Sequence, residues 1–407
     1  MKRWKKIALG LLTLIVLSQM PFIYRRYKFG RLHRTIENLN AQRTPQDNDD
    51  AYLDHRGVIH VHSLLGGHST GKFEEIISAA KANELSFVVM TEHPARQINT
   101  FETTLSGMHE GVLFINGSEI NTAGEDRLLV LPGITPLIEN SSSSTQSLIN
   151  RAKSEGKLAF IAYPEQFQNW SAHDYDGLEI YNLYANTKKI NYARLFFDGL
   201  WSYWSYPHLL FTTFYEKPAG NLKRWDELML KESRRLIAIA GNDAHANVGF
   251  GVQDLTGKAF VGIKLDPYER SFRVVRMHVL VEKEQALNAE TLLSGLAHGH
   301  CYIAFDLFCE SSGFRFTAES RAEKKVMGDE ITLVEDGGGV RLKVSTPVKS
   351  RIVFLRDGQV IHEEGHALQK EMIVEERGIY RVEVYLDQLG KPLSEQTWII
   401  SNPIYVR

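Results

Sequence analysis

Residues 57–63 read GVIHVHS, an apolar run of β-type residues that carries two histidines, His60 and His62, near its end. Side chains two positions apart in a strand emerge on the same face, so these two imidazoles can share one divalent ion. His68 follows in a glycine-flanked segment that can bring it back to the same place. Since a single His-x-His pair is a common pattern, a metal site needs further ligands elsewhere in the chain.

The same design recurs further along the chain, where apolar runs end in residues that ligate metals. VVMTEH ends in His93, FINGSE ends in Glu119, and IAGNDAH carries Asp243 and His245. The carboxyl ends of parallel barrel strands meet at one face, so we expect all of these side chains to converge there. Glu119 can anchor one ion and bridge to a second about 3.5–4 Å away. Histidine and carboxylate ligands suit zinc, manganese or iron alike.

Between the ligand segments, apolar runs alternate with segments of helical periodicity. We expect strands in GVIHVHS, SFVVMTEH, GVLFINGSEI, KLAFIAYP, DGLEIYN and RRLIAIAG, and helices in GKFEEIISAAKANEL and STQSLINRAKSEG. This alternation predicts βα repeats around a parallel sheet over residues 55–315. Residues 316–407 alternate with period two and contain the hairpin dipeptide Asp357–Gly358, which predicts a small antiparallel β-sandwich domain.

Residues 7–24, IALGLLTLIVLSQMPFIY, carry no charge and are flanked on both sides by basic residues. Such a segment is just long enough to cross a bilayer as a helix, and no small-residue cleavage site follows it. We expect residues 1–30 to be a single-pass membrane anchor; a cleaved signal and a buried helix are the alternatives. Residues 31–54 are polar, and we expect them to form a linker to the catalytic part. We expect this part to lie outside the cytoplasm, although the positive charge is similar on both sides of the apolar segment and favours neither membrane orientation strongly.

Composition narrows the possible partners. The net charge of −2 over 407 residues provides no basic field, so nucleic acid is not an expected partner. Cys301 and Cys309 cannot form a disulfide framework; we expect two buried thiols, with a single bridge between them as the alternative. Residues 190–230 form an insertion whose segment 192–215 holds ten aromatic residues. We expect helices packed on the barrel, with an aromatic lid or a membrane-facing patch as the alternative.

The ligand motifs resemble those of the PHP family (polymerase and histidinol phosphatase domain). H-x-H with a histidine six residues on, T-[DE]-H, G-x-E and D-x-H match IHVHSLLGGH, MTEH, GSE and NDAH, within residues 55–310. The β segment ending in WIISNPIYVR resembles the branch that includes carbaryl hydrolase. The resemblance implies a distorted (β/α)7 TIM-like barrel with a metal cluster at its C-terminal mouth.

The same resemblance implies how the ligands are shared between two divalent ions. One ion would be held by His60, His62, Glu119 and Asp243, and the other by His68, His93 and His245. Glu119, Asp243 and His245 are the expected catalytic residues. Tyr163 and Asn182 stand where the family pattern has further metal ligands, so two ions, or one tightly and one weakly bound ion, are expected rather than three.

These expectations describe a metal-dependent hydrolase, and a phosphoesterase with a metal-activated water is the first hypothesis. Its substrate would be a phosphorylated small molecule. One alternative is a hydrolase of carboxyl esters or carbamates, with the aromatic insertion lining its pocket. Another is a non-catalytic envelope protein with one structural metal and a binding β domain. A nucleic-acid exonuclease is associated with the family, but the net charge and the anchor argue against it. The oligomeric state stays open.

Two other motifs are typical of functional sites, but we expect both to be structural here. Residues 362–366 spell HEEGH, the zincin signature, but that chemistry needs a helix and this copy follows a predicted hairpin. Arg270, Arg273 and Arg276 are spaced three apart and could bind a phosphate. A solvated basic edge is the simpler expectation for them.

Overall fold

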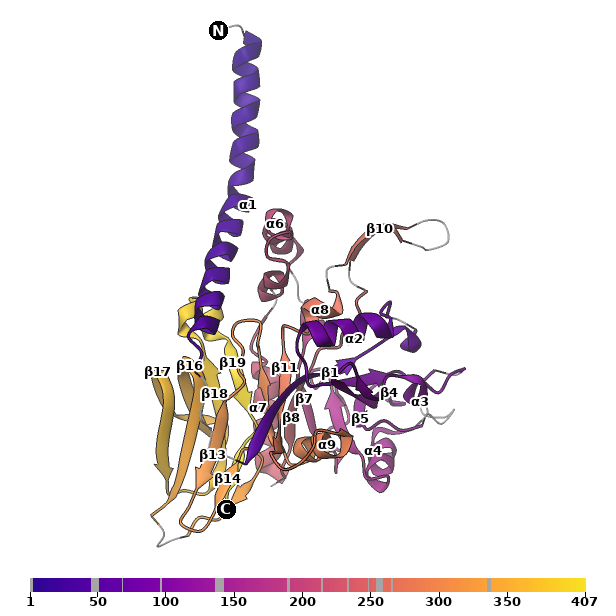
Figure 1. Cartoon of the computed structure of the whole chain (residues 1–407), viewed down its shortest axis with the longest axis vertical. Helices are drawn as coiled ribbons and strands as arrows, with labels where there is room; N and C mark the ends of the chain where they lie inside the picture. Colours follow the sequence, from indigo (N-terminus) through magenta and orange to yellow (C-terminus); the bar gives the residue numbers. More distant parts are fainter. Residues whose placement is uncertain are drawn as a thin grey trace.

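A long N-terminal helix projects from an α/β body that is continuous with a set of C-terminal strands (Figure 1). This computed structural model describes residues 3–44, 51–67, 69–95, 97–135, 143–188, 191–213, 215–232, 234–247, 249–253, 259–264, 266–334 and 338–407.

Helix α1 runs from Arg3 to Ala41 and contains both the predicted anchor and the start of the predicted linker. Its N-terminal part stands clear of the body, while its C-terminal part lies beside the body (Figure 1). Residues 31–41 continue the helix because Ile36 and Leu39 bury their side chains in the main core. By length and composition α1 could cross a membrane, and a signal sequence passes the same test.

Each strand and helix expected over residues 55–315 is present. The strands up to residue 304 are β1 Tyr52–Val61, β2 Phe87–Glu92, β3 Gly107–His109, β4 Val112–Asn121, β5 Arg127–Leu131, β6 Leu158–Ala162, β7 Gly177–Asn182, β8 Ile237–Gly241, β9 Gly249–Gln253, β10 Ala259–Lys264, β11 Arg276–Glu282 and β12 Cys301–Ala304. The helices are α2 Phe73–Ala82, α3 Thr100–Thr103, α4 Thr145–Ser154, α5 Leu183–Thr187, α6 Tyr192–Ser202, α7 Ala219–Glu232, α8 Tyr268–Ser271 and α9 Ala289–Ala297, with 3-10 turns η1 Leu64–Gly66 and η3 Pro207–Thr213.

The sheet is mixed rather than purely parallel. Pairing is parallel from β1 through β2 to β4, and again from β6 through β7 to β8. Between these sets β5 runs antiparallel to both β4 and β6. Only residues 122–126 connect β4 to β5, and a parallel crossover needs about a dozen residues or more, so the chain must turn back. The strand β5 is absent from the sequence-based expectation.

The closed (β/α)7 barrel that the family resemblance implies is not shown, because the described strands form an open mixed sheet. On the side away from β2, β1 pairs antiparallel with β11, and β8 forms its ladder with β7. Hydrogen bonds still hold the end of β8 near β1. The Asn242 N–H donates to the Ile59 carbonyl at 2.9 Å, and the Ala244 N–H donates to the His60 carbonyl at 3.2 Å. These bonds place Asp243 beside His60.

The C-terminal strands extend this sheet, since the ladder passes from β11 through β12 to β19 and β18. The remaining elements are β13 Arg315–Glu319, β14 Lys324–Val326, β15 Glu330–Ile331, β16 Val340–Arg356, β17 Gln359–Val374, β18 Gly378–Tyr385, η4 Asp387–Leu389, η5 Leu393–Glu395, β19 Thr397–Ser401 and β20 Ile404–Val406. A boundary at residue 315 and a separate sandwich therefore stay predictions.

Local expectations for this part and for the two cysteines that precede it are confirmed. Asp357 and Gly358 join β16 to β17 with φ of 52° and 77°, as a two-residue hairpin of type I′ requires. The HEEGH motif, residues 362–366, lies within β17, so it lacks the helix that zincin chemistry needs. Cys301 and Cys309 are free and buried, and burial raises the pKa of both thiols.

A buried charge network joins β1, β11 and β12. His278 Nδ1 lies 2.8 Å from Asp54 Oδ1, and its Nε2 lies 3.1 Å from Asp306 Oδ2. The Tyr302 hydroxyl donates to Asp54 at 2.7 Å. Burial alone would lower the pKa of His278, but Asp54 and Asp306 raise this pKa to about 10. His278 is therefore a buried cation between two carboxylates.

Replacing His278 with glutamine removes the cation between those two carboxylates and leaves them only the more distant Arg315 and Arg276, each 3.5 Å away. We expect the free energy of unfolding to fall by about 3 kcal/mol. A raised folded-state pKa stabilises fully below the unfolded value of about 6.5, and this contribution disappears as pH rises through about 10. Urea unfolding of the full chain in detergent should therefore show a smaller difference between variant and wild type at the alkaline end.

The matched control is His298→Gln at the exposed C-terminal end of α9, which should change stability by no more than about 0.5 kcal/mol. An equal loss for His278→Gln across that pH range would contradict the assignment of a protonated, ion-paired His278.

Candidate metal centre

Side chains from separate strands meet in one buried cluster. His60 lies in β1, His62 directly follows this strand, Glu119 lies near the end of β4, and Asp243 follows β8. All four side chains are buried. Each offers one ligand atom, and these atoms lie within 4.8 Å of one another. The strand ends thus bring together residues up to 183 positions apart in the chain (243 minus 60).

The two carboxylates both face the two imidazoles. Glu119 Oε2 lies 3.1 Å from His60 Nε2 and 3.3 Å from His62 Nε2. Asp243 Oδ1 lies 3.5 Å from His60 Nε2 and 3.4 Å from His62 Nε2. Asp243 Oδ1 is buried and accepts no hydrogen bond within the described part of the chain. Two imidazoles and two carboxylates are a donor set for a divalent ion, so this cluster could hold a metal.

The backbone is strained at two of the four cluster residues, His60 and Asp243, and at Tyr163. The backbone φ angles of His60, Tyr163 and Asp243 are 68°, 49° and 48°, in the left-handed region that residues other than glycine rarely adopt. The pairing of β1 with β2 shifts register between Ile59 and Val61, so His60 sits at a bulge rather than in the regular strand that the His-x-His spacing suggests. Bulges redirect side chains, and strain of this kind persists where the surrounding structure enforces it, often at functional sites.

A carboxylate that the sequence-based reasoning missed supports His60. Glu179 in β7 is fully buried, and its Oε1 lies 2.6 Å from His60 Nδ1. A carboxylate behind a ligand histidine fixes the orientation of the ring and its tautomer. Gly241 makes room for the pair, because a Cβ there would lie 1.7 Å from Glu179 Oε1. The available signal was a glutamate within the buried strand GLEIYN.

Tyr163 and Asn182 occupy the positions where the family resemblance implied further metal ligands, and each bonds to a carboxylate of the site: Tyr163 to the candidate ligand Asp243, and Asn182 to Glu179 behind His60. The Tyr163 hydroxyl donates a short hydrogen bond to Asp243 Oδ2. Burial and the Asp243 charge raise the pKa of Tyr163, so its hydroxyl keeps the proton it donates. The Asn182 side-chain amide donates to Glu179 Oε2 at 3.1 Å.

Two of the other expected ligands lie against the same cluster. His93 Nε2 is 3.1 Å from Glu119 Oε2, and this side chain is partly exposed. The ring of His245 stacks on His62 with centroids 4.5 Å apart, and His245 Nδ1 donates to the Asp243 carbonyl at 2.7 Å. His68 lies outside the described residues. A second ion on His68, His93 and His245 therefore stays a proposal.

The histidines and carboxylates of the cluster shift one another's pKa values. Burial alone would lower the pKa of His62, but the oxygens of Asp243 and Glu119 raise it to about 9. Burial would raise the pKa of Glu119 and Asp243, but the neighbouring histidines hold both below their usual range. An entering divalent ion would replace imidazole protons, as metal binding at histidine sites generally does.

Arg127 brings a further cation to the edge of the cluster. This residue begins β5, its Nη1 lies 3.4 Å from Glu119 Oε1, and more than a third of its side chain is exposed. Its guanidinium also lies 4.9 Å from the ring centroid of Tyr163. A half-exposed guanidinium can meet an anionic group that approaches the cluster.

The other arginines considered for phosphate binding have structural partners. Arg276 is buried and lies 3.5 Å from Asp306 and 3.3 Å from Glu310. Arg273 pairs with Glu269, and Arg270 donates to the Tyr203 hydroxyl at 3.1 Å. Arg276 is buried and does not fit the expected solvated edge, whereas Arg270 and Arg273 are both partly exposed.

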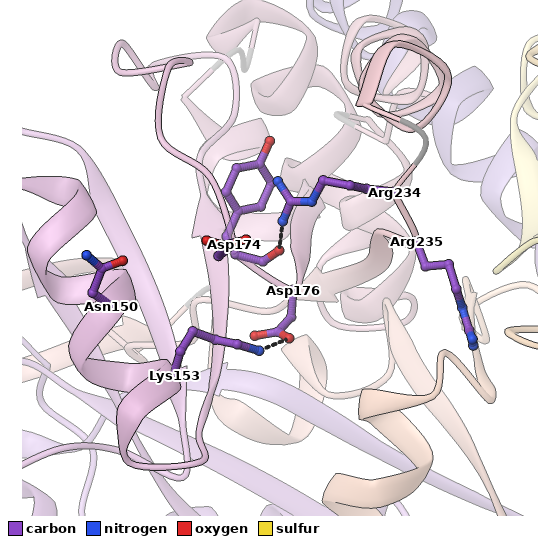
Figure 2. Close-up of a pocket in the computed structure, with 7 residues that line it drawn as sticks. Asn150, Lys153, Asp174, Asp176, Arg234 and Arg235 are labelled. Atoms are coloured by element: carbon purple, nitrogen blue, oxygen red, sulfur yellow. Dashed lines mark hydrogen bonds and ion pairs between the residues drawn. The ribbon is translucent and has the colours of Figure 1, made fainter.

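A further pocket of about 470 Å³ is lined by residues that precede β7 and β8, among them Asp176 and Arg235, and Figure 2 draws these residues. The cationic side chains of this pocket already have partners within the chain. Lys153 Nζ lies 2.7 Å from Asp176, and Arg234 donates to the Tyr175 carbonyl at 2.6 Å. Arg235 points away from these groups (Figure 2) and donates to the Gly328 carbonyl. The residues that line this pocket do not include any of the four cluster residues, so the pocket is not part of the candidate metal centre.

Comparisons with known proteins add little to this geometry. No protein-family model matches the sequence, and no curated protein matches it. PsfC from Pseudomonas syringae PB-5123 is similar in structure, with 14% identity and a TM-score of 0.34, over 62% of this chain and 91% of PsfC. The lesion-specific endonuclease PfuEndoQ from Pyrococcus furiosus has 12% identity and a TM-score of 0.35, over 60% of this chain and 56% of the endonuclease. At these values the functional argument rests on the cluster itself.

Replacing Glu179 with glutamine should weaken metal binding by about 10–100-fold, the usual effect of losing a carboxylate behind a ligand histidine. Competition between the full chain in detergent and a fluorescent chelator measures the affinity. The control is Glu165→Gln, whose side chain is exposed and bonds to Asn221. Unchanged affinity in Glu179→Gln would contradict the placement of the ion on His60.

Proposed function

We propose that this chain is a membrane-anchored, metal-dependent hydrolase of the PHP type that cleaves phosphoesters of small molecules. The observation that supports it most is the buried cluster of His60, His62, Glu119 and Asp243 beside the carboxyl ends of β1, β4 and β8. The order of these ligands along the chain also follows the PHP motifs.

In the proposed mechanism, some residues of the site hold the ion and others orient its ligands. Glu119, Asp243 and the imidazoles of His60 and His62 hold the ion, while Glu179 and Tyr163 orient His60 and Asp243. When bound, a divalent ion polarises an ester oxygen and lowers the pKa of water toward about 7. His93 reaches the solvent-exposed edge of the cluster, where a substrate can approach. Glu119, Asp243 and His245 are the proposed catalytic residues, and no side-chain nucleophile is required.

Two observations favour a phosphoester over a neutral ester or carbamate. Arg127 places a half-exposed positive charge beside Glu119, which suits an anionic substrate. The apolar pocket for a carbamate was expected from the aromatic insertion, but Phe196 and Phe197 of α6 lie against Phe22 of α1. These two rings therefore pack on the N-terminal helix rather than on the cluster.

The proposed location follows from α1. Its apolar part would anchor the chain in a membrane as a single span, with the catalytic part outside the cytoplasm.

The full chain in detergent should hydrolyse aryl phosphomonoesters or phosphodiesters, lose turnover on chelation and regain it with zinc, manganese or iron. His62→Ala should lower turnover to background, whereas His173→Ala, exposed before β7, should leave it unchanged. Turnover that survives both chelation and His62→Ala would refute the proposal.

The same assay separates the substrate classes. Arg127→Ala should raise KM for aryl phosphates by roughly tenfold, the effect of losing one partly exposed charged hydrogen bond of about 1.5 kcal/mol, with Arg127→Lys in between. Aryl carboxyl esters and carbamates should be poorer substrates and insensitive to this change. Retention of metal without turnover of any ester would favour a structural metal in a binding protein.

A further inference from the structure

Helix α6 presents an exposed apolar face, made by Tyr192, Phe196 and Leu200 and continued by Trp204 beyond its end. The first three are spaced four apart in the helix, so they lie on one side. Tyr192 is 76% exposed, Leu200 is 54% exposed and Trp204 is 79% exposed. Large exposed aromatic side chains gathered on one element mark a contact surface.

This face lies next to the apolar part of α1. Phe22 of α1 packs on Phe196 and Phe197, with ring centroids 5.5 Å and 5.0 Å apart. Arg25 forms a two-point ion pair with Asp198, which is 2% exposed, and one of its bonds measures 2.7 Å. Figure 1 shows α6 alongside α1, outside the sheet.

Successive contacts fix the level of α6 along α1. Phe196 lies beside Phe22 and Asp198 beside Arg25, whereas Tyr206, just after α6, lies 5.3 Å from the His33 ring. The two helices therefore descend in the same direction. The N-terminal half of α6 stands at the last turn of the uncharged segment, residues 7–24, where the basic residues begin.

That level is the one at which a bilayer would meet water. Tryptophan and tyrosine are enriched at membrane interfaces because their rings are both apolar and polar, and basic residues flank the span. The Arg25–Asp198 pair removes two isolated charges from this zone. The exposed face of α6 thus continues the exposed apolar surface of α1.

We infer that the exposed face of α6, together with Trp204, is a second membrane contact that lies in the interfacial zone of the phospholipid bilayer entered by α1. The contact holds the metal centre at a fixed height and tilt. The link to the centre is short, because α5 precedes α6 and its Tyr184 ring lies 5.3 Å from the ring of His245. This inference rests on the insertion of α1 and goes beyond the hydrolase activity.

The test uses the full chain in vesicles of phosphatidylcholine and phosphatidylglycerol, with an environment-sensitive fluorophore on one introduced cysteine. The native cysteines are buried, so labelling is selective. The probe site is Leu200→Cys. The control for insertion is Leu14→Cys in the apolar part of α1, and the matched exposed control is Leu230→Cys, 46% exposed in α7.

Labels at Leu200 and Leu14 should shift to shorter emission wavelengths and lose emission to lipids brominated on the upper acyl chain, whereas the label at Leu230 should not respond. A Leu200 label that behaves like Leu230 while Leu14 is quenched would overturn the inference, as would an unquenched Leu14 label. Thiol cross-linking of Leu200→Cys between two copies in place of quenching would assign the face to a dimer. Phosphoester turnover in the same vesicles reports separately on the proposed hydrolase.

Discussion

The structure depends on the charge of two buried carboxylates, Glu119 and Asp243. An ionised carboxylate removed from water is costly unless cations or donors surround it. Here the Nε2 atoms of His60 and His62 lie 3.1–3.5 Å from Glu119 Oε2 and Asp243 Oδ1. A divalent ion would neutralise the same carboxylates while the imidazoles are uncharged. The unusual features nearby serve this arrangement: the bulge at His60, the left-handed backbone at Asp243, and the space left by Gly241. A binding site thus accounts for strain that packing alone would not require.

Much of this site could be predicted from the chain, because its ligands follow apolar runs and parallel strands end on the same side. The supporting residues were harder to find. Glu179 and Tyr163 act through hydrogen bonds to His60 and Asp243, and such contacts depend on how strands lie side by side rather than on spacing along one strand. Asn182 and Tyr163 stand where metal ligands were expected, yet each donates a hydrogen bond to a carboxylate: Asn182 to Glu179 and Tyr163 to Asp243. The roles of Asn182 and Tyr163 can be assigned only when their hydrogen-bond partners are known.

The fold shows a similar division. Element positions follow from periodicity, but sheet topology depends on connection length and on long-range pairing. The short link before β5 forces an antiparallel turn within what was expected to be a parallel barrel. At the other edge, β11 and β12 carry the sheet onward to β19, and the His278 network ties this junction together. An open sheet can still gather ligands, since two backbone hydrogen bonds hold the end of β8 at β1.

The central claim is that these four side chains bind an ion directly, and X-ray absorption at the zinc edge of the zinc-loaded full chain tests it most directly. The account predicts an ion retained through gel filtration, with imidazole scattering and nitrogen or oxygen neighbours at about 2.0–2.2 Å. A spectrum of hydrated zinc without imidazole ligands, or loss of the ion at neutral pH from a folded chain, would contradict it.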